Sequence, residues 1–388
     1  MLDWEIAVFG AVPYDHLLRG RTGAFVDILL QRGYNVYYFE IPPASPLQVV
    51  KENVFRKRGV INFLCGPYKK VKNLYLFSFP PIFPASRYQM GVLRTFNTKR
   101  MLFHIRDKFP PPAKTHSKIV CFVSTPYWEP IIKEINFSLI VYDCIDDLKV
   151  FCKEKHLNYF ASLHACLINR ADLVIVSAKT LEDDIRKINP SVPVYLIPNG
   201  VPANFYKTEI SVPKDLMSLP RPIVGFIGAL FEWVDIKLIE DSAKKFPSYS
   251  FVLIGPMQNI EMTKCKNIYY LGPRNYSEIP AYINAFDVCI IPFVPGEVSK
   301  KVDPIKVYEY LAYGKPVITI NVPELRKLAN ILYFAETPEE FISMLATAVA
   351  ENNEEIKEKR MIFAQNNTWE IRTQTLINII NKHLQTKQ

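Results

Sequence analysis

The sequence lacks the features that mark secreted and membrane-spanning proteins. Its seven cysteines are scattered and include no CxxC pair. This pattern argues against a disulfide framework and against a zinc site, and it indicates free thiols in a reducing compartment. No uninterrupted apolar run approaches the roughly 20 residues that span a bilayer. The opening residues, Met1-Leu2-Asp3-Trp4-Glu5, are acidic and lead into a predicted strand, so we expect no secretory signal. We therefore expect a cytoplasmic protein.

Several catalytic signatures are also missing. We find no Walker-type phosphate loop, no run of metal ligands, no Ser-His-Asp pattern and no DxD triplet placed to hold a metal–diphosphate complex. The acidic stretch Asp143-Cys144-Ile145-Asp146-Asp147 contains no such triplet. We therefore expect no metal site and no cofactor.

Basic residues are abundant and concentrated in one stretch. The formal net charge is +9, and residues 87–118 contain eight Lys or Arg against one acid, Asp107. Such a stretch suits an anionic membrane surface, a diphosphate-linked acceptor or nucleic acid, and a solvated surface is the plain alternative. Nucleic acid is the least favoured of these, because we recognise no aromatic-basic readout module.

Buried strands alternate with helical patterns through the first half of the chain. Continuous apolar runs, without polar alternation, predict parallel strands that are covered on both faces. The predicted strands are Glu5–Val12, Asn35–Ile41, Leu74–Phe79, Ile119–Ser124, Leu139–Cys144, Leu173–Ser177 and Val194–Ile197. A helix is predicted over residues 22–32, and a basic helix with aromatic residues over residues 86–109.

A second α/β series follows a proline-containing stretch without periodicity. Its predicted strands are Ile223–Ile227, Phe251–Ile254, Ile268–Leu271, Val288–Pro292, Val317–Ile320 and Ile331–Phe334. We therefore predict an α/β protein with two Rossmann-like domains facing across a cleft in which a ligand is held. The boundaries are residues 1–201 for the first domain, 202–220 for a linker, 221–365 for the second domain and 366–388 for a C-terminal amphipathic helix.

The stretch from Asp303 to Pro316 carries a helix start and a helix stop. Asp303 suits the N-cap and Pro304 the first helical position, while Gly314 suits a left-handed end. Lys306 is unfavourable in a first turn, where the helix dipole is positive, unless a phosphate docks there. Glu309 follows on the same face and can accept hydrogen bonds from a ribose diol. A core helix with one awkward lysine and one solvated glutamate is the alternative.

Two further stretches lie at predicted carboxyl ends of strands. Gly228, in Gly225-Phe226-Ile227-Gly228, lets backbone N–H groups approach a diphosphate, although tight packing explains the glycines about as well; Trp233 lies at the same edge. In the first domain Asp143, Asp146 and Asp147 cluster after a strand, where one carboxylate can take a proton from an acceptor hydroxyl and another can cap the next helix. Asp15 and His16 form a second acid–base pair or a loop hydrogen bond.

These stretches together resemble a known family. Gly225–Asp235, Phe251–Pro256, Tyr270–Pro273, Pro280–Ile283, Asp287–Phe293 and Asp303–Pro316 are similar to one branch of the bacterial GT-B glycosyltransferases, as are Tyr142–Asp147, Ala171–Ser177 and Pro198–Val201. The branch is the teichuronic-acid-biosynthesis type (family 4/1-like), with a more distant similarity to exopolysaccharide glucuronosyltransferases. Residues 42–118 match little.

The resemblance implies a metal-independent hexosyltransferase that uses a nucleotide-diphosphate sugar, UDP-linked for example, in polysaccharide biosynthesis. The acceptor would be a glycan or a lipid-linked precursor at the inner face of the cell membrane, with the enzyme cytoplasmic or peripheral. The implied donor-binding residues are Gly228, Trp233, Lys306, Tyr308 and Glu309. Asp143, Asp146 and Asp147 would face the acceptor, with Asp146 as general base, and the C-terminal helix would cross back to the first domain.

Two departures from the family keep other functions open. Lys301 stands where many relatives have a second glutamate, and Phe231, Glu232 and Trp233 stand where they have basic residues. A catalytically silent sugar-nucleotide-binding protein and a nucleotide-sugar epimerase on the same fold are the alternatives. Turnover of the donor, with and without an acceptor, distinguishes them.

Overall fold

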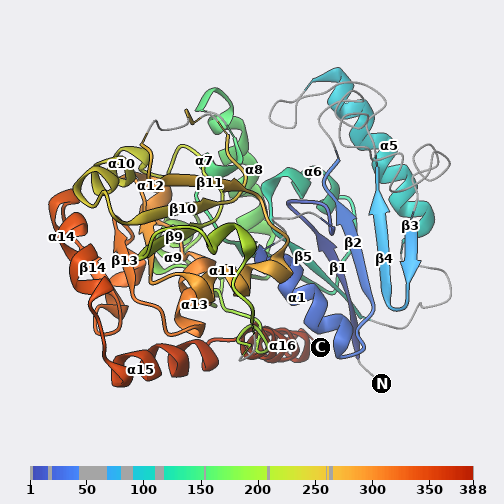
Figure 1. Ribbon diagram of the computed structural model, residues 1–388. Helices are drawn as coiled ribbons and strands as arrows, with labels where there is room; N and C mark the ends of the chain where they lie inside the picture. The colour runs from blue at the N-terminus through green and yellow to red at the C-terminus, as the bar shows by residue number, and fades with distance from the viewer. Residues whose placement is uncertain are drawn as a thin grey trace. The chain divides into compact units, whose positions relative to one another are not determined.

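The chain folds into two compact units. The computed structural model describes residues 3–15, 20–42, 68–79, 91–109, 118–152, 154–207, 210–258, 260–261 and 265–387 (Figure 1). Unit 1 consists of Met1–Ile197 and Thr373–Gln388, and unit 2 of Pro198–Arg372. The predicted linker, residues 202–220, thus falls within unit 2, and the chain returns to unit 1 near its end.

Unit 1 is built on an eight-stranded sheet in the order β3-β4-β2-β1-β5-β6-β7-β8. Every neighbouring pair is parallel except β3 and β4. The strands are β1 (Trp4–Phe9), β2 (Val36–Glu40), β3 (Tyr68–Val71), β4 (Leu74–Ser78), β5 (Lys118–Val123), β6 (Leu139–Cys144), β7 (Leu173–Val176) and β8 (Val194–Leu196). β1, β2 and β7 are buried along their whole length, as their continuous apolar runs predict.

The helices of unit 1 follow the strands in alternation. They are α1 (Gly20–Gln31), α5 (Val92–Lys108), α6 (Glu129–Ile132), α7 (Leu148–Phe151), α8 (Leu157–Arg170), α9 (Lys179–Ile188) and the larger part of α16 (Trp369–Thr386). Trp4 donates its indole N–H to Asn381 at 2.7 Å, and Tyr195 bonds His383 at 2.9 Å. These contacts fasten α16 to β1, an interior strand of the sheet, and to β8, an edge strand.

Unit 2 is built on a six-stranded parallel sheet in the order β11-β10-β9-β12-β13-β14. Chain order therefore reverses between β9 and β12, which is the topological switch point of a doubly wound fold. The strands are β9 (Ile223–Ile227), β10 (Ser250–Ile254), β11 (Ile268–Gly272), β12 (Val288–Pro292), β13 (Val317–Ile320) and β14 (Tyr333–Ala335).

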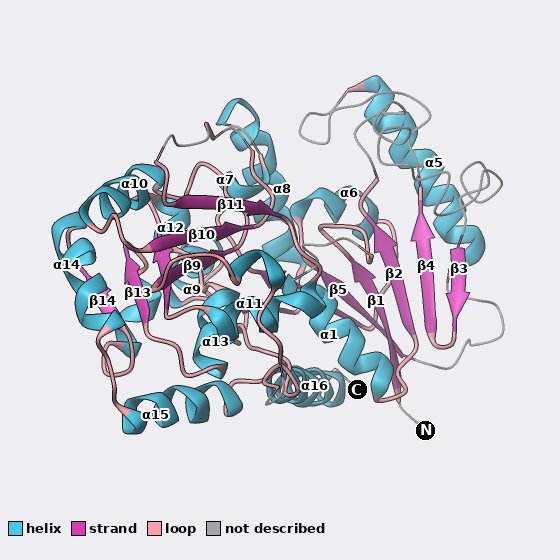
Figure 2. Ribbon diagram, viewed as in Figure 1, coloured by secondary structure: helices cyan, strands magenta, loops and turns pink. Residues whose placement is uncertain are grey.

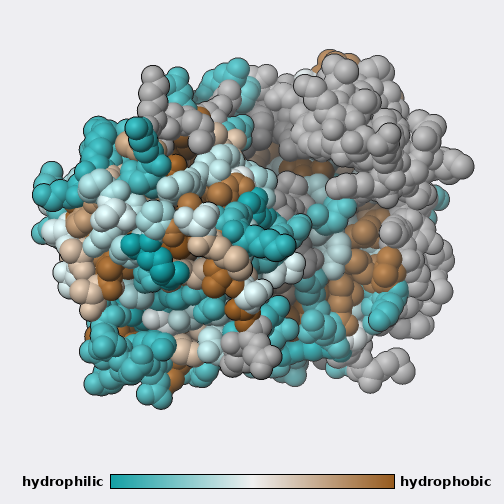
Figure 3. Space-filling view, viewed as in Figure 1, coloured by the Kyte–Doolittle hydropathy of each residue, from teal (hydrophilic) through white to brown (hydrophobic). Residues whose placement is uncertain are grey.

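Helices flank this second sheet (Figure 2). They are α10 (Ile236–Lys245), α11 (Ile279–Ala285), α12 (Glu297–Lys300), α13 (Ile305–Ala312), α14 (Pro338–Val349) and α15 (Glu354–Gln365). Hydrophilic side chains gather over α15 on the face shown in Figure 3, where Lys357 and Lys359 pair with Glu354 and Glu355. The opposite side of the same element buries Arg360 and Ala364, so α15 is a surface helix with one buried face.

The fold prediction is confirmed in its main features. All thirteen predicted strands are present, with ends displaced by a few residues at most, and both sheets are Rossmann-like. The antiparallel strand β3 was not predicted, because Tyr68-Lys69-Lys70-Val71 is short and polar. The basic helix begins at Val92 in the described chain, and the part predicted before it, residues 86–90, lies outside the described residues.

Among the described residues, no helix is both long enough and apolar enough to cross a membrane.

Candidate functional site

The switch point of unit 2 brings a glycine loop and a lysine together. Gly228 follows β9, Phe293 follows β12, and Lys306 is the second residue of α13. A Cβ atom built on Gly228 would lie 2.8 Å from Cε and 2.9 Å from Nζ of Lys306. The two residues are thus in direct contact. The sequence analysis assigned both to the donor site but predicted no contact between them.

Gly228 is required by two independent constraints. Its φ of +149° lies in a region that side-chain-bearing residues rarely adopt. A Cβ on the next strand's glycine, Gly255, would lie 1.9 Å from the Gly228 carbonyl oxygen. Gly255 therefore lies against the backbone after β9, and a larger residue at 228 must displace the Lys306 side chain.

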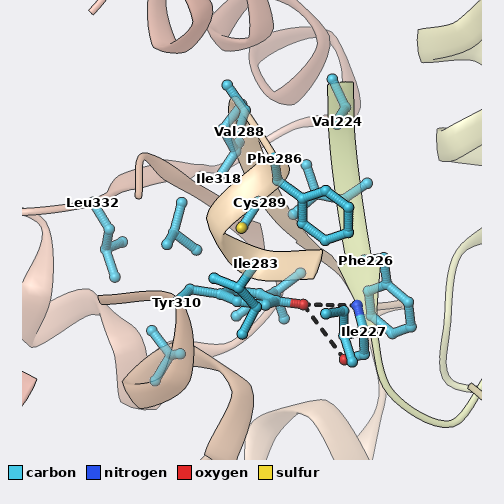
Figure 4. Packing of buried hydrophobic residues seen from close by; sticks show 14 of the residues in the cluster. Val224, Phe226, Ile227, Ile283, Phe286, Val288, Cys289, Tyr310, Ile318 and Leu332 are labelled. Carbon is cyan, nitrogen blue, oxygen red and sulfur yellow. Dashed lines mark hydrogen bonds between the residues drawn. The ribbon is translucent and has the colours of Figure 1, made fainter. Parts of the chain in front are cut away.

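Tyr310 fixes the position of α13 against this loop. The Tyr310 hydroxyl accepts from the Ile227 backbone N–H at 2.8 Å and lies 3.4 Å from the Ile227 carbonyl oxygen (Figure 4). Tyr310 is fully buried in the core of unit 2, together with Val307 and Leu311 of the same helix face. Because Ile227 directly precedes Gly228, this bond holds α13 beside the glycine loop.

Lys306 lies between two aromatic rings. Its Nζ is 4.8 Å from the centroid of Phe226 and 4.9 Å from that of Phe293, so both rings contribute cation–π attraction. Burial nevertheless lowers the pKa of Lys306 to about 8, against a weaker opposing effect from Glu309. An ammonium that is poorly solvated and lies at a helix N-terminus is suited to binding an anion.

Glu309 lies one turn farther along α13 and is 6% exposed. Its Oε1 accepts a hydrogen bond from the Tyr276 hydroxyl at 2.8 Å. Burial raises the pKa of Glu309, while the Tyr276 bond and Lys306 lower it. The alternative of a solvated glutamate is therefore wrong, because this carboxylate is buried and hydrogen-bonded.

Asp303 does not cap α13, so that prediction is wrong. The helix begins after Pro304, which is the N-cap residue and offers no side-chain bond. The Asp303 carboxylate instead accepts from the backbone N–H of Asn199 at 2.6 Å and from the Tyr308 hydroxyl at 3.0 Å. The Asn199 side chain also donates to the Asp303 carbonyl, so the aspartate ties the Pro198-Asn199-Gly200 turn to α13.

Two predicted donor-binding residues, Tyr308 and Trp233, have contacts of their own that do not involve the rings around the Lys306 ammonium. Tyr308 is 2% exposed, with its hydroxyl on Asp303 and its ring stacked on Phe363 at 5.9 Å. Trp233 is half-buried after β9, its carbonyl accepting from Val294 at 3.0 Å and its ring packed on Phe231. Tyr308 therefore supports α13 through its contacts with Asp303 and Phe363, whereas Trp233 lies on the loop that follows Gly228.

The three aspartates of unit 1 have distinct environments. Asp143 is fully buried and paired with Arg21 at 3.0 Å, and Arg21 also donates to the Ile197 carbonyl. Asp147 caps α7 by accepting from the Lys149 backbone N–H at 2.9 Å. Asp146 accepts no hydrogen bond from the described part of the chain, and burial beside the other two carboxylates raises its pKa to about 7.

These environments separate structural from chemical roles within the cluster. The ion pair of Asp143 and the helix cap formed by Asp147 are structural roles. The sequence analysis predicted such a cap as the alternative role for one of the three aspartates. Asp146 alone has a pKa close to the range in which a carboxylate accepts and returns protons at neutral pH. Of the other acid–base pair, Asp15 is exposed and His16 lies outside the described residues.

The sequence analysis missed the residues that surround the predicted ones. Phe226 and Phe293 enclose Lys306, Tyr276 binds Glu309, and Arg21 neutralises Asp143. Phe226 and Phe293 had one available signal, since each lies at the end of a strand next to the switch point. Tyr276 and Arg21 had none, because their partners lie 33 and 122 residues away in the sequence.

Comparisons with known proteins identify a family domain over the part of the chain that contains the glycine loop and α13. The family model described as "Glycosyl transferases group 1" matches residues 221–351. Unit 2 thus contains a glycosyl transferases group 1 domain. The match spans the strands, the glycine loop and the whole of α13.

One curated relative and several solved structures extend the similarity beyond this domain. The Bacillus subtilis (strain 168) protein TuaH, named as a teichuronic acid biosynthesis glycosyltransferase, is 25% identical over 281 residues, which are 66% of this chain and 71% of TuaH. Sucrose-phosphate synthase from Thermosynechococcus elongatus superposes with a TM-score of 0.70 at 13% identity, covering 97% of this chain and 98% of that one. Anabaena HepE in complex with UDP superposes with a TM-score of 0.65 at 14% identity, covering 98% and 100%.

The comparisons confirm the predicted GT-B fold and favour a glycosyltransferase over an epimerase or a silent binding protein. Metal independence stays a prediction. No group of three or more His, Cys, Asp or Glu side chains suited to a metal ion occurs within the described ranges.

Proposed function

We propose that this glycosyltransferase moves a sugar from a UDP-sugar to a glycan or lipid-linked acceptor in the synthesis of a cell-surface polysaccharide. The polysaccharide context is supported by the similarity to TuaH, and the UDP-linked donor by the similarity to HepE, which was solved with UDP. No cofactor is required, since the nucleotide sugar is itself a substrate.

The observation that carries the proposal is the contact between Lys306 and Gly228 at the start of α13. A diphosphate placed there meets the positive end of a helix and one ammonium. Charge grows on the diphosphate as the glycosidic bond breaks, and these groups stabilise that charge without a metal ion. Phe231, Glu232 and Trp233 supply no cation after the loop, so Lys306 is the principal cationic partner we assign.

Asp146 is the general base that we assign on the acceptor side. Its raised pKa, about 7, matches the removal of a proton from an attacking hydroxyl near neutral pH. Asp143 and Asp147 act through it, because their charges contribute to that raised pKa. They are positioning residues in this proposal.

Helix α5 supplies a surface for the membrane-linked part of the proposal. Val92 is 86% exposed and Phe103 is 70% exposed, and both lie on a helix that also contains Lys99, Arg100 and Arg106. Exposed apolar side chains among basic ones suit the boundary of an anionic bilayer. Phe103→Ser combined with Val92→Ser is expected to reduce co-sedimentation with vesicles containing phosphatidylglycerol, whereas salt-insensitive binding to neutral vesicles would contradict this assignment.

Transfer and binding assays with UDP-, GDP- and dTDP-sugars test the donor assignment. Lys306→Ala is expected to weaken binding of the accepted donor by about tenfold to a hundredfold, because it removes a charge-assisted contact worth roughly 1.5–3 kcal/mol. Lys237→Ala is the matched control. Lys237 is also the second residue of a helix in unit 2, but its side chain is 71% exposed and pairs with Asp241.

Three outcomes decide between the candidate functions. Transfer to an acceptor that requires Lys306 supports the proposal. Donor binding without turnover would favour a silent binding protein, and conversion of the donor without any acceptor would favour an epimerase. No binding of any sugar nucleotide would overturn the donor site itself.

A further inference from the structure

Tyr276 occupies a position beside the buried carboxylate of the proposed donor site. It begins the 3-10 turn Tyr276–Glu278, which follows β11. Its hydroxyl donates to Oε1 of Glu309 at 2.8 Å, while its side chain remains 47% exposed. One end of this tyrosine is thus bound within the site, and a large part of it faces solvent.

The loop that presents Tyr276 is fastened on both sides. Glu278 accepts from the backbone and side chain of Asn275 at 2.9 and 2.8 Å, which closes the turn around Tyr276. Arg274 bonds the Leu271 carbonyl, the Tyr282 hydroxyl and the Asp215 carboxylate. A guanidinium that donates to these partners in fixed directions holds the loop against the body of unit 2.

Phe205 supports the tyrosine ring. The two ring centroids lie 5.7 Å apart at 40°, and Phe205 is only 4% exposed. The Tyr276 ring therefore rests on a buried neighbour, which restricts its side-chain rotation. A ring held in this way offers a preorganised surface, so ordering it on ligand binding costs little conformational entropy.

The hydrogen bond from Tyr276 changes what Glu309 can offer a nucleoside. A carboxylate with both oxygens available binds the two hydroxyls of a ribose directly. Here Oε1 already accepts from Tyr276, and no described residue donates to Oε2. A ribose diol must therefore either displace the tyrosine hydroxyl or use it.

We propose that Tyr276 and Glu309 bind the ribose jointly and that Tyr276 sets the preference for a ribonucleotide donor. One ribose hydroxyl donates to Oε2 of Glu309. The other donates to the hydroxyl oxygen of Tyr276, which still donates its own proton to Oε1. The exposed ring stacks against the base. This inference rests on the proposed function, since it assigns a role within the same donor site.

The chemistry of both partners fits this assignment. A phenol has one proton to donate and lone pairs to accept, so it can relay a hydrogen bond from a ribose hydroxyl to a carboxylate. Burial raises the pKa of Glu309, and the bond from Tyr276 opposes that effect by favouring the ionised, accepting form. Every proton in the chain from ribose to carboxylate therefore has an acceptor.

Calorimetric titration with UDP, 2′-deoxy-UDP and 3′-deoxy-UDP tests the inference on the full chain. Tyr276→Phe keeps the ring and removes the hydroxyl. We expect the wild type to prefer UDP over at least one deoxy analogue by about tenfold, and Tyr276→Phe to bring that ratio close to one. Tyr276→Ala is expected to weaken binding of all three ligands by a further tenfold or so, because base stacking is lost.

Tyr333→Phe is the matched control. Its hydroxyl also donates to a glutamate of unit 2, Glu351, at 2.8 Å, and that pair lies at β14, on the opposite edge of the sheet from β11. This variant is expected to retain the wild-type preference. It thus separates loss of a local tyrosine–glutamate bond from loss of ribose recognition.

Two results would overturn the inference while leaving the proposed function intact. An unchanged ratio between UDP and both deoxy analogues in Tyr276→Phe would show that the hydroxyl does not contact the ribose. Tighter UDP binding by Tyr276→Phe would show that the hydroxyl competes with the ribose for Glu309. Failure of the wild type to bind any UDP ligand would instead count against the proposed function.

Discussion

Lys306 shows at the scale of one residue how an unfavourable placement indicates function. Its ammonium is poorly solvated, lies over two rings and sits at the positive end of a helix. A residue chosen for stability alone would not carry a charge there, because desolvation and the helix dipole both disfavour it. Groups with shifted pKa values concentrate at functional sites for this reason.

The lowered pKa of Lys306 gives a pH dependence for donor binding. Only the protonated amine attracts a diphosphate, and it loses its proton above about pH 8 in the free enzyme. UDP affinity is therefore expected to fall above pH 8, by up to about tenfold per pH unit. The terminal phosphate of UDP is already ionised there, since its second pKa is roughly 6.

Lys306→Arg supplies the control for this dependence. A guanidinium stays protonated throughout the range, so the variant should bind UDP with an affinity that changes little between pH 7 and 10, whatever its absolute value. Titration calorimetry across that range measures both proteins. A flat profile for the wild type would show that Lys306 does not contact the diphosphate.

Asp146 is the residue whose replacement is expected to affect chemistry without affecting donor binding. Its carboxyl is an effective base only when ionised, so kcat/KM should rise with pH through about 7, the value to which burial raises its pKa. Asp146→Asn should lower kcat by about 10²–10⁴-fold and leave UDP affinity within roughly twofold of wild type.

Asp183→Asn serves as the control for Asp146→Asn. Asp183 lies in α9 of the same unit and its side chain is 57% exposed, so its replacement removes a carboxylate from the surface alone. Steady-state rates and UDP titrations on both variants separate catalysis from binding. Full activity in Asp146→Asn would assign the base elsewhere.

At the scale of the element, α13 is positioned by bonds at both of its ends. Tyr310 bonds the end of β9, and Asp303 bonds the turn at Asn199. Gly314 ends the helix with φ of +63°, as its sequence position predicted. The helix has only eight residues, so its stability depends on these tertiary contacts more than on helix propensity.

Replacing Asp303 should therefore destabilise unit 2. Asp303→Ala leaves the Asn199 N–H and the Tyr308 hydroxyl without their acceptor, and we expect it to lower the free energy of unfolding by about 2–4 kcal/mol. Asp303→Asn keeps one acceptor oxygen and should recover part of this loss. Urea denaturation monitored by circular dichroism measures both variants, and equal stability of all three proteins would contradict the assigned role.

The titration of Asp303 has a definite sign. Burial raises its folded-state pKa to about 6, so between pH 4 and 6 the folded state binds more protons than the unfolded state. The stability that this group contributes is present at low pH and is lost as the pH rises through 6. As the pH rises from 4 to 6, the free energy of unfolding of Asp303→Asn should therefore increase relative to that of the wild type.

At the scale of the whole molecule, the chain completes unit 1 only with its last residues. Leu376, Ile380 and Leu384 of α16 are buried, and His383 and Asn381 bond side chains of β8 and β1. Unit 2, by contrast, is continuous in the chain from Pro198 to Arg372. The two units thus differ in how much they depend on the C-terminal residues.

Truncation after Arg372 is expected to destabilise unit 1 selectively. It removes several buried apolar side chains, each worth about 1.5–3 kcal/mol of burial free energy. Hydrogen exchange should therefore accelerate in β1 and β8 but much less in β9 and β12, and UDP binding should persist. Truncation after Thr386 is the control, and equal loss of protection in both units would contradict the division.

The sequence by itself determined the two α/β series, the strands and the identity of Lys306 and Glu309 as an unusual pair. These follow from local patterns, namely continuous apolar runs, glycine and proline at element ends, and a cation in a first helical turn. Such patterns report on neighbours within one helix or strand, which is why the element types were predicted well.

Only the tertiary structure decided what each polar group binds. Asp303 bonds the Asn199 turn and does not cap a helix, Asp143 pairs with Arg21, and Tyr276 donates to Glu309. These partners are distant in the sequence, and their hydrogen bonds depend on which loops meet within each unit. Because burial and pairing set the pKa of a carboxylate, the division of Asp143, Asp146 and Asp147 into structural and chemical roles became visible only in the folded chain.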